Sequence, residues 1–166
     1  TGAARLCAEL GARVTGTDRR TAEQLGPDAA ALEELGVSLV LGEHRDRDFL
    51  DADLVVLSPG VPLDQPQVAA ARAAGVPVLG ELELAASQLA CPVFAITGTN
   101  GKSTTTTFAG ELLRSAGLTT FVGGNLGTPL SEGVGARAWD AAVVEVSSFQ
   151  LETAPTFHPR VAAMLN

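Results

Sequence analysis

The chain has 166 residues, enough for one ordinary domain or two small ones. Hydrophobic residues make up 46% and aromatic residues 4%, so we expect a core of Leu, Val, Ile and Ala. The formal net charge of −8 argues against a nucleic-acid binder, and no apolar stretch approaches the ~20 residues that cross a membrane. We therefore expect no nucleic-acid or membrane partner. Cys7 and Cys91 are isolated and lack metal-ligand spacing, so we interpret them as reduced thiols of a cytoplasmic protein, and we expect a monomer.

Helices and strands alternate along the first half of the chain, which predicts an α/β fold with a parallel sheet. Helices are expected at residues 2–10, 29–35, 66–74 and 81–90, and strands at 13–17, 37–41, 53–57 and 76–79. Residues 42–48 are expected to form a polar loop. Gly80 breaks the last of these strands, and a phosphate-binding unit follows. We therefore predict two domains, residues 1–80 and 81–166.

Asp18 follows the first expected strand. A helix followed by a strand that ends in an acid resembles the second half of a Rossmann unit, in which the acid binds a ribose or a base. On that interpretation the opening strand would lie upstream of Thr1. The alternative is a solvated turn residue, and the sequence alone favours neither.

A Ser-Pro-Gly run follows the strand at residues 53–57. Ser58 and Gly60 would place a hydroxyl and bare backbone at the carboxyl edge of the sheet, where ligands bind in open α/β sheets. A rigid turn is the alternative, since Pro and Gly also serve that purpose. We favour ligand binding.

The run Thr97-Gly98-Thr99-Asn100-Gly101-Lys102-Ser103-Thr104 joins an expected strand, residues 92–96, to an expected helix, residues 105–115. Backbone N–H groups of such a loop and the positive end of the helix dipole converge on one spot, where an anion fits. Lys102 can bridge two phosphates, Ser103 can offer a hydroxyl to Mg²⁺, and glycines let the backbone approach the phosphate.

The loop is shorter than the usual P-loop, which has four residues between its first glycine and Gly-Lys. An ordinary tight turn is therefore the alternative. A cation at a helix N-terminus opposes the dipole, however, so we expect something negative to bind there.

Two further segments can serve the same site. A strand at residues 119–122 leads into Gly123-Gly124-Asn125, whose amide can donate to a phosphate or a carboxylate. An apolar strand over residues 140–148 contains Glu145, and the end of the chain is expected to form another strand. A lone carboxylate on a buried strand is costly unless it is paired or metal-bound, so Glu145 is a candidate Mg²⁺ ligand. The alternative is a structural ion pair with Arg or Lys.

Taken together, the loop of residues 97–104, the Gly-Gly-Asn run and the run of residues 145–152 (Glu-Val-Ser-Ser-Phe-Gln-Leu-Glu) resemble the Mur ligases. These are ATP-dependent, amide-forming enzymes of bacterial cell-wall synthesis. The last run and Ser-Pro-Gly-Val-Pro at residues 58–62 are most similar to the members that add D-glutamate to UDP-N-acetylmuramoyl-L-alanine. The resemblance covers the whole chain.

The resemblance implies most of a Rossmann-like uridine-nucleotide domain, lacking its first strand, followed by the front part of a P-loop ATPase domain. A third domain and later metal ligands would be missing, so we expect this chain alone to be inactive.

It also implies a role for each candidate residue. Phosphate N–H groups come from Gly98, Thr99, Asn100 and Gly101; Lys102 supplies charge; Ser103 and Glu145 hold Mg²⁺, and Thr104 is a nearby helper. The sugar nucleotide is bound by Asp18, Ser58 and Gly60, and Asn125 faces its activated end. ATP and Mg²⁺ are thus the expected cofactors, with Lys102 and Glu145 as catalytic residues.

Three rival functions stay open. The nearest is a related ligase that adds another amino acid or glutamates a folate. A P-loop NTPase without ligation would lack a uridine-nucleotide site in the first half of the chain. The third is a non-catalytic nucleotide-binding module.

Overall fold

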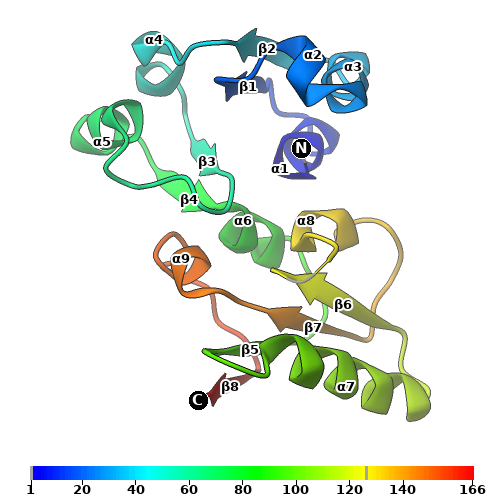
Figure 1. Ribbon diagram of the computed structural model, residues 1–166. Helices are drawn as coiled ribbons and strands as arrows, with labels where there is room; N and C mark the ends of the chain where they lie inside the picture. Colours follow the sequence, from blue (N-terminus) through cyan, green and yellow to red (C-terminus); the bar gives the residue numbers. More distant parts are fainter. Residues whose placement is uncertain (1, 126) are drawn as a thin grey trace. The chain divides into compact units, whose positions relative to one another are not determined.

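The computed structural model describes residues 2–125 and 127–166 (Figure 1). Its contacts divide the chain into two compact units, Thr1–Leu79 and Gly80–Asn166. The helices are α1 (Gly2–Glu9), α2 (Ala22–Leu25), α3 (Pro27–Glu34), α4 (Asp46–Leu50), α5 (Pro66–Ala73), α6 (Glu81–Ser87), α7 (Lys102–Ser115), α8 (Leu130–Gly133) and α9 (Ser148–Leu151). The strands are β1 (Thr15–Asp18), β2 (Ser38–Leu41), β3 (Val55–Leu57), β4 (Val78–Gly80), β5 (Val93–Gly98), β6 (Thr120–Gly124), β7 (Ala141–Glu145) and β8 (Val161–Leu165).

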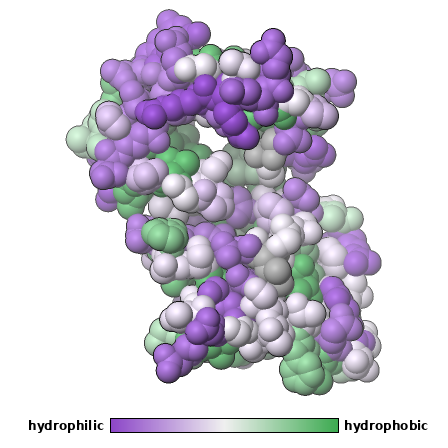
Figure 2. All heavy atoms as spheres, viewed as in Figure 1, coloured by the Kyte–Doolittle hydropathy of each residue, from purple (hydrophilic) through white to green (hydrophobic). Residues whose placement is uncertain are grey.

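The first unit contains paired strands and flanking helices. Strands β1 and β2 pair in parallel, with Asp18 opposite Leu41 at their carboxyl ends, and β3 pairs with β4. One core cluster joins α4, β3 and α5 through Phe49, Leu57 and Val68, and the Val68 side chain is 0% exposed. Hydrophilic residues cover much of the visible surface of this unit (Figure 2).

The second unit is built on a four-stranded sheet in the order β6-β7-β5-β8. All its strand pairs are parallel, so their carboxyl ends meet at one edge. Every residue of the central strand β7 is buried, as expected for an apolar strand covered on both faces. Helix α7 contacts β5, β6 and β7, and helix α6 contacts α8.

The predicted α/β class with parallel sheets is confirmed, and most differences from the expected elements concern very short helices. Residues 42–48, predicted to be loop, include the start of α4. Helices α2, α8 and α9 have four residues each and were not predicted, because one turn is too short to show helical periodicity. The strand predicted at residues 140–148 ends at Glu145. Within the described ranges, no helix is both long and apolar enough to span a membrane.

Candidate active site

The loop between β5 and α7 has the geometry of an anion cradle. Gly101 precedes the first residue of α7 with a φ of 78°, a left-handed conformation that favours glycine. No side chain of the described residues caps this helix. The first N–H groups of a helix have no partner within it, so those of α7 can bind an anion at this loop.

Gly98 and Thr99 face β8. A Cβ on Gly98 would lie 2.0 Å from the carbonyl oxygen of Leu165, and the Thr99 N–H donates to that oxygen at 3.3 Å. Gly98 is therefore required for strand packing, and its role in the approach to phosphate stays a prediction. Since the Thr99 N–H already has a partner, Asn100, Gly101 and the first turn of α7 are the better N–H candidates.

Lys102 turns back over the loop. Its Nζ donates to the carbonyl oxygens of Gly98 at 2.7 Å and Thr99 at 3.1 Å. These bonds hold the ammonium above the loop. A cation fixed there adds to the positive potential of the helix terminus and favours a bound polyanion.

Ser103, Glu145 and Asn125 meet at the carboxyl edge of the sheet. Ser103 Oγ donates to Glu145 Oε2 at 2.7 Å, and Asn125 Nδ2 donates to Glu145 Oε1 at 2.9 Å. The register explains this convergence, because Glu145 at the end of β7 lies opposite Ile96 on β5 and Gly124 on β6. The structure thus brings together three residues that are far apart in the sequence.

Glu145 is buried, with 3% exposure, and its two hydrogen-bond donors are neutral. No Arg or Lys of the described ranges forms an ion pair with it. A carboxylate and a hydroxyl are hard oxygen donors of the kind that Mg²⁺ prefers. The donor set therefore fits that ion. No group of three or more His, Cys, Asp or Glu in the described residues could hold a metal alone, so phosphate or water oxygens would complete the coordination.

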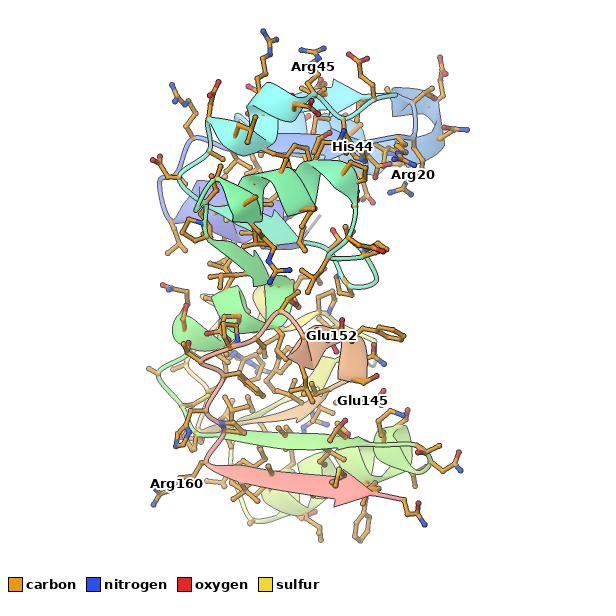
Figure 3. All side chains as sticks on the ribbon, turned by 90° about the vertical axis from the view of Figure 1, so that its left-hand side faces the viewer. Arg20, His44, Arg45, Glu145, Glu152 and Arg160 are labelled. Carbon is orange, nitrogen blue, oxygen red and sulfur yellow. The ribbon has the colours of Figure 1, made fainter. Side chains whose placement is uncertain are left out.

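Asp18, in the first unit, lies at the end of β1 and pairs with Arg20. Arg20 donates through its backbone N–H and its guanidinium, with Nη2 2.8 Å from Asp18 Oδ2. The side-chain hydrogen bond from Arg20 lowers the pKa of Asp18, against the effect of partial burial. Nearby, Thr17 Oγ1 lies 2.8 Å from His44 Nδ1, and Arg20 and His44 lie at one end of this unit (Figure 3). The sequence predicted His44 to be a solvated loop residue and did not single out Arg20, although an Arg two residues after a strand-ending Asp is a usable signal of this ion pair.

Ser58 and Gly60 lie in an exposed turn after β3. The Ser58 carbonyl accepts the N–H of Val61 at 3.2 Å, and Gly60 has a φ of 84°. Strands β1 and β3 belong to separate sheets in the described residues, so Asp18 is not joined to this turn by strand pairing. The turn interpretation and the ligand-binding interpretation are both compatible with this geometry. Thr104 is exposed on the first turn of α7.

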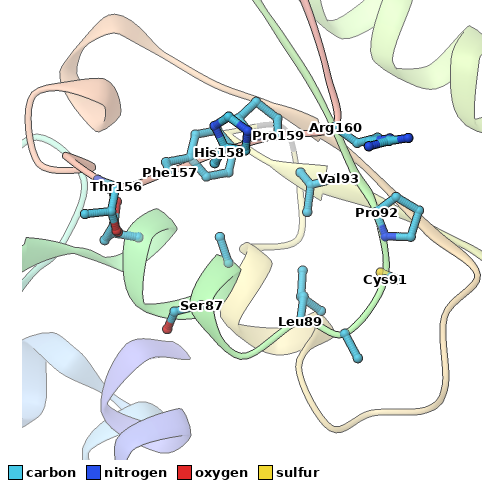
Figure 4. A pocket seen from close by; sticks show the side chains of 13 residues that line it. Ser87, Leu89, Cys91, Pro92, Val93, Thr156, Phe157, His158, Pro159 and Arg160 are labelled. Atoms are coloured by element: carbon cyan, nitrogen blue, oxygen red, sulfur yellow. Dashed lines mark hydrogen bonds between the residues drawn. The ribbon is translucent and has the colours of Figure 1, made fainter.

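A separate cavity of 510 Å³ lies at the opposite end of β5 (Figure 4). Its walls come from the end of α6, the start of β5 and the segment before β8, and include Cys91, Phe157 and His158. Burial raises the pKa of the Cys91 thiol. None of the residues predicted to bind nucleotide or metal lines this cavity.

Two family profiles match the chain. Residues 2–80 match "Mur ligase MurD-like, N-terminal domain", and residues 96–166 match "Mur ligase middle domain". The chain belongs to the Mur ligase family. The strand and loop that carry Asp18 lie in the N-terminal Mur ligase domain, and Ser103, Asn125 and Glu145 lie in the middle domain.

Curated relatives agree with this assignment. The chain is 60% identical over 166 residues to a UDP-N-acetylmuramoylalanine–D-glutamate ligase of Anaeromyxobacter dehalogenans and 51% identical over 165 residues to one of Syntrophotalea carbinolica. Each alignment covers 99% of this chain and 36% of the relative. The chain thus spans about a third of the length of these Mur ligases.

Solved structures of the family share the fold. A UDP-N-acetylmuramate:L-alanyl-gamma-D-glutamyl-meso-diaminopimelate ligase from Neisseria meningitides aligns with a TM-score of 0.57 at 22% identity, over 98% of this chain and 55% of that one. A UDP-N-acetylmuramate-alanine ligase from Thermotoga maritima aligns with a TM-score of 0.53 at 25% identity, over 98% and 37%. At this identity the likeness supports the Mur ligase fold alone.

Proposed function

We propose that this chain is part of an ATP-dependent ligase that adds D-glutamate to UDP-N-acetylmuramoyl-L-alanine during peptidoglycan synthesis. The observation that carries the proposal is the 2.7 Å bond between Ser103 at the loop and the buried carboxylate of Glu145. Relatives that are 51% and 60% identical are named as ligases of these two substrates, which supports the same substrates here.

The proposed reaction has two steps. A carboxylate oxygen of UDP-N-acetylmuramoyl-L-alanine attacks the γ-phosphorus of ATP, so that ADP leaves and an acyl phosphate forms. The amine nitrogen of D-glutamate then attacks the acyl carbon; the C–O bond to phosphate breaks, the amine loses a proton, and an amide and inorganic phosphate remain. Both steps bring polyanions together, so cationic groups must offset the repulsion.

On this proposal the second unit holds the triphosphate. The N–H groups of Asn100, Gly101 and the first turn of α7 bind phosphate oxygens, and the Lys102 ammonium stabilises charge that develops on the transferred group. Ser103 and Glu145 would hold Mg²⁺, which supplies charge neutralisation at the phosphates, with Thr104 beside them. Glu145 must give up or share its bond from Ser103 to do so.

The sugar nucleotide occupies the rest of the proposed site. Asn125 Nδ2 carries two N–H groups: one donates to Glu145, and the other is proposed to donate to the carboxylate or phosphate at the activated end of the substrate. The Asp18–Arg20 pair, Ser58 and Gly60 are proposed to contact the uridine and diphosphate. An arginine beside the strand-ending acid adds a cation suited to a diphosphate.

The test is a ligation assay with the complete enzyme that contains this chain. Phosphate release and product formation are followed with ATP, Mg²⁺, UDP-N-acetylmuramoyl-L-alanine and a panel of amino acids. We expect both signals to require D-glutamate. Phosphate release that is independent of any amino acid would point to an NTPase, and a preference for another amino acid or a folate would point to a related ligase.

A further inference from the structure

Helix α6 carries two buried carboxylates that have no place in the proposed nucleotide site. Glu81 and Glu83 are each 5% exposed. Neither forms an ion pair in the part of the chain that the structure describes. A buried carboxylate is costly unless donors satisfy it, so the donors that each one binds indicate what it does.

Glu81 binds the start of another helix. Its Oε1 accepts the backbone N–H of Ser131 at 2.6 Å, fifty residues further along the chain. Ser131 lies in the first turn of α8, whose N-cap is Pro129, a residue without a side chain that can cap. The Glu81 carboxylate therefore caps the N-terminus of α8, a role that a Ser or Asp at the N-cap position has in other helices.

Helix α8 in turn ends the loop that begins with Asn125. The loop is closed at its start by a bond from the Gly124 N–H to the Thr128 carbonyl at 2.8 Å. Asn125 donates two hydrogen bonds to Glu145: its backbone N–H donates to the Glu145 carbonyl at 2.8 Å, and its Nδ2 donates to the carboxylate. Thr128 is followed directly by Pro129 and α8, so we expect a shift of α8 to reach Asn125 through the bond between Gly124 and Thr128.

We infer that Glu81 is a positioning residue: by capping α8, it fixes the loop that presents Asn125 to Glu145 and to the reacting end of the sugar nucleotide. The functional half of this inference rests on the proposed ligase activity. The structural half, that Glu81 sets the position of α8, can be tested without any activity.

Glu83 provides a matched control on the same helix. It accepts hydrogen bonds from the backbone N–H of Thr156 at 3.2 Å and from the Thr156 hydroxyl. Thr156 belongs to the segment before β8, and Glu83 and Thr156 both line the cavity of Figure 4. Glu83 is as buried as Glu81 but binds a different segment, so its loss should disturb stability without moving α8.

The chain also contains a probe of α8. Trp139 is its single tryptophan, and the indole Nε1–H donates to the carbonyl of Gly133, the last residue of α8, at 2.7 Å. In the complete enzyme the indole ¹H–¹⁵N signal is assigned by its loss in Trp139→Phe. We expect Glu81→Met to shift this signal, and Glu81→Gln, whose amide oxygen still accepts from Ser131, to leave it near the wild-type position. Glu83→Met should leave it unchanged.

Steady-state kinetics test the functional half. We expect Glu81→Met to raise the KM for UDP-N-acetylmuramoyl-L-alanine about tenfold, from the loss of one buried charge-assisted bond, while the KM for ATP stays within about twofold. Glu81→Gln should recover most of the loss. Glu83→Met should lower Tm, but it should not raise the KM for UDP-N-acetylmuramoyl-L-alanine relative to the KM for ATP.

Two results would overturn the inference. One is an unshifted indole signal in Glu81→Met. The other is that Glu81→Met and Glu83→Met change the KM for UDP-N-acetylmuramoyl-L-alanine and the KM for ATP by equal factors. A wild-type enzyme that does not ligate would refute the proposed function instead, and the indole signal would still decide whether Glu81 positions α8. If Glu81→Met does not fold, Pro129→Ser added to that variant supplies a local N-cap side chain for α8, and it should restore the fold if capping is what Glu81 contributes.

Discussion

At the scale of single residues, Lys102 has the clearest expected effect. Its ammonium is held over the loop by two carbonyl oxygens, where it would meet the transferred phosphate. We expect Lys102→Met to lower kcat/KM of the complete ligase by about 10²- to 10⁴-fold, as losses of a charge clamp do.

The matched control for Lys102 is Arg114→Met, which removes a cation from the last turn of the same helix. It should leave kcat/KM within about threefold, because Arg114 binds Glu111 and the Thr120 carbonyl instead of the loop. Retained activity in Lys102→Met, with unchanged ATP affinity, would contradict the role given to this lysine.

Asp18 provides a pH-dependent prediction. Its pKa is lowered first by the side-chain hydrogen bond from Arg20. A lowered folded-state pKa stabilises the fold above the ordinary pKa of Asp, and this contribution is lost as the pH falls through the lowered value. We expect Arg20→Gln to return the Asp18 pKa toward its ordinary range, as followed by carboxyl NMR titration.

Arg19→Gln is the control for Arg20→Gln, since Arg19 is exposed and forms no side-chain hydrogen bond to Asp18 in the described residues. Arg19→Gln should leave the Asp18 titration unchanged, and it should lose stability at acidic pH as the wild type does. Equal shifts in the two variants would mean that general positive charge, and not the specific pair, lowers the Asp18 pKa.

At the scale of elements, the junction of β5 and β8 depends on Gly98. A Cβ there would meet the Leu165 backbone at 2.0 Å, and the φ of 131° is unfavourable for other residues. We expect Gly98→Ala to destabilise the fold by about 3 kcal/mol or more, since backbone atoms on both sides must move. Urea unfolding measures this loss.

Gly117→Ala separates the steric effect from the backbone effect. Gly117 also has a positive φ, 87°, but a Cβ there has nothing within 4 Å. It should cost about 1 kcal/mol from conformation alone. If the two variants were equally stable, the contact between Gly98 and Leu165 would have no energetic importance.

The elements also show where sequence reasoning reached its limit. The long patterned segments were predictable: the buried strand β7 reads as a continuous apolar run, and α7 follows the glycine loop. The four-residue helix α9 was missed, although Ser147 and Gln150 form a capping box that could have marked it. A capping box can therefore indicate a one-turn helix even where no helical periodicity follows.

The strand order explains why only part of the candidate site could be predicted from the sequence. Glu145 could be nominated from sequence because an acid at the end of an apolar strand is unusual. Its contact with Asn125 follows only from the pairing of β6 with β7, a tertiary fact that no local pattern contains. Glu81 gave no signal, because its partner Ser131 lies fifty residues away and is bound through its backbone.

At the scale of the whole molecule, a net charge of −8 must be reconciled with two proposed polyanionic ligands. Charges more than about 8 Å away are largely screened at physiological ionic strength, so the local environment dominates binding. That environment is N–H groups and Lys102 at the loop, and the guanidinium of Arg20, beside Asp18, in the first unit. The overall acidity therefore does not oppose nucleotide binding.

Because the proposed ligands are assigned to different segments, hydrogen exchange of the complete enzyme can separate them. A non-hydrolysable ATP analogue with Mg²⁺ should slow exchange by about tenfold or more in peptides covering residues 97–104 and the segment after Glu145. UDP-N-acetylmuramoyl-L-alanine alone should protect peptides that contain Asp18, Ser58 and Asn125. Peptides from the core of α5, where Val68 and Ala71 are 0% exposed, exchange slowly in any state and serve as the internal reference. Protection of the first unit by the ATP analogue, or none there with the sugar nucleotide, would show that the two sites had been assigned to the wrong halves of the chain.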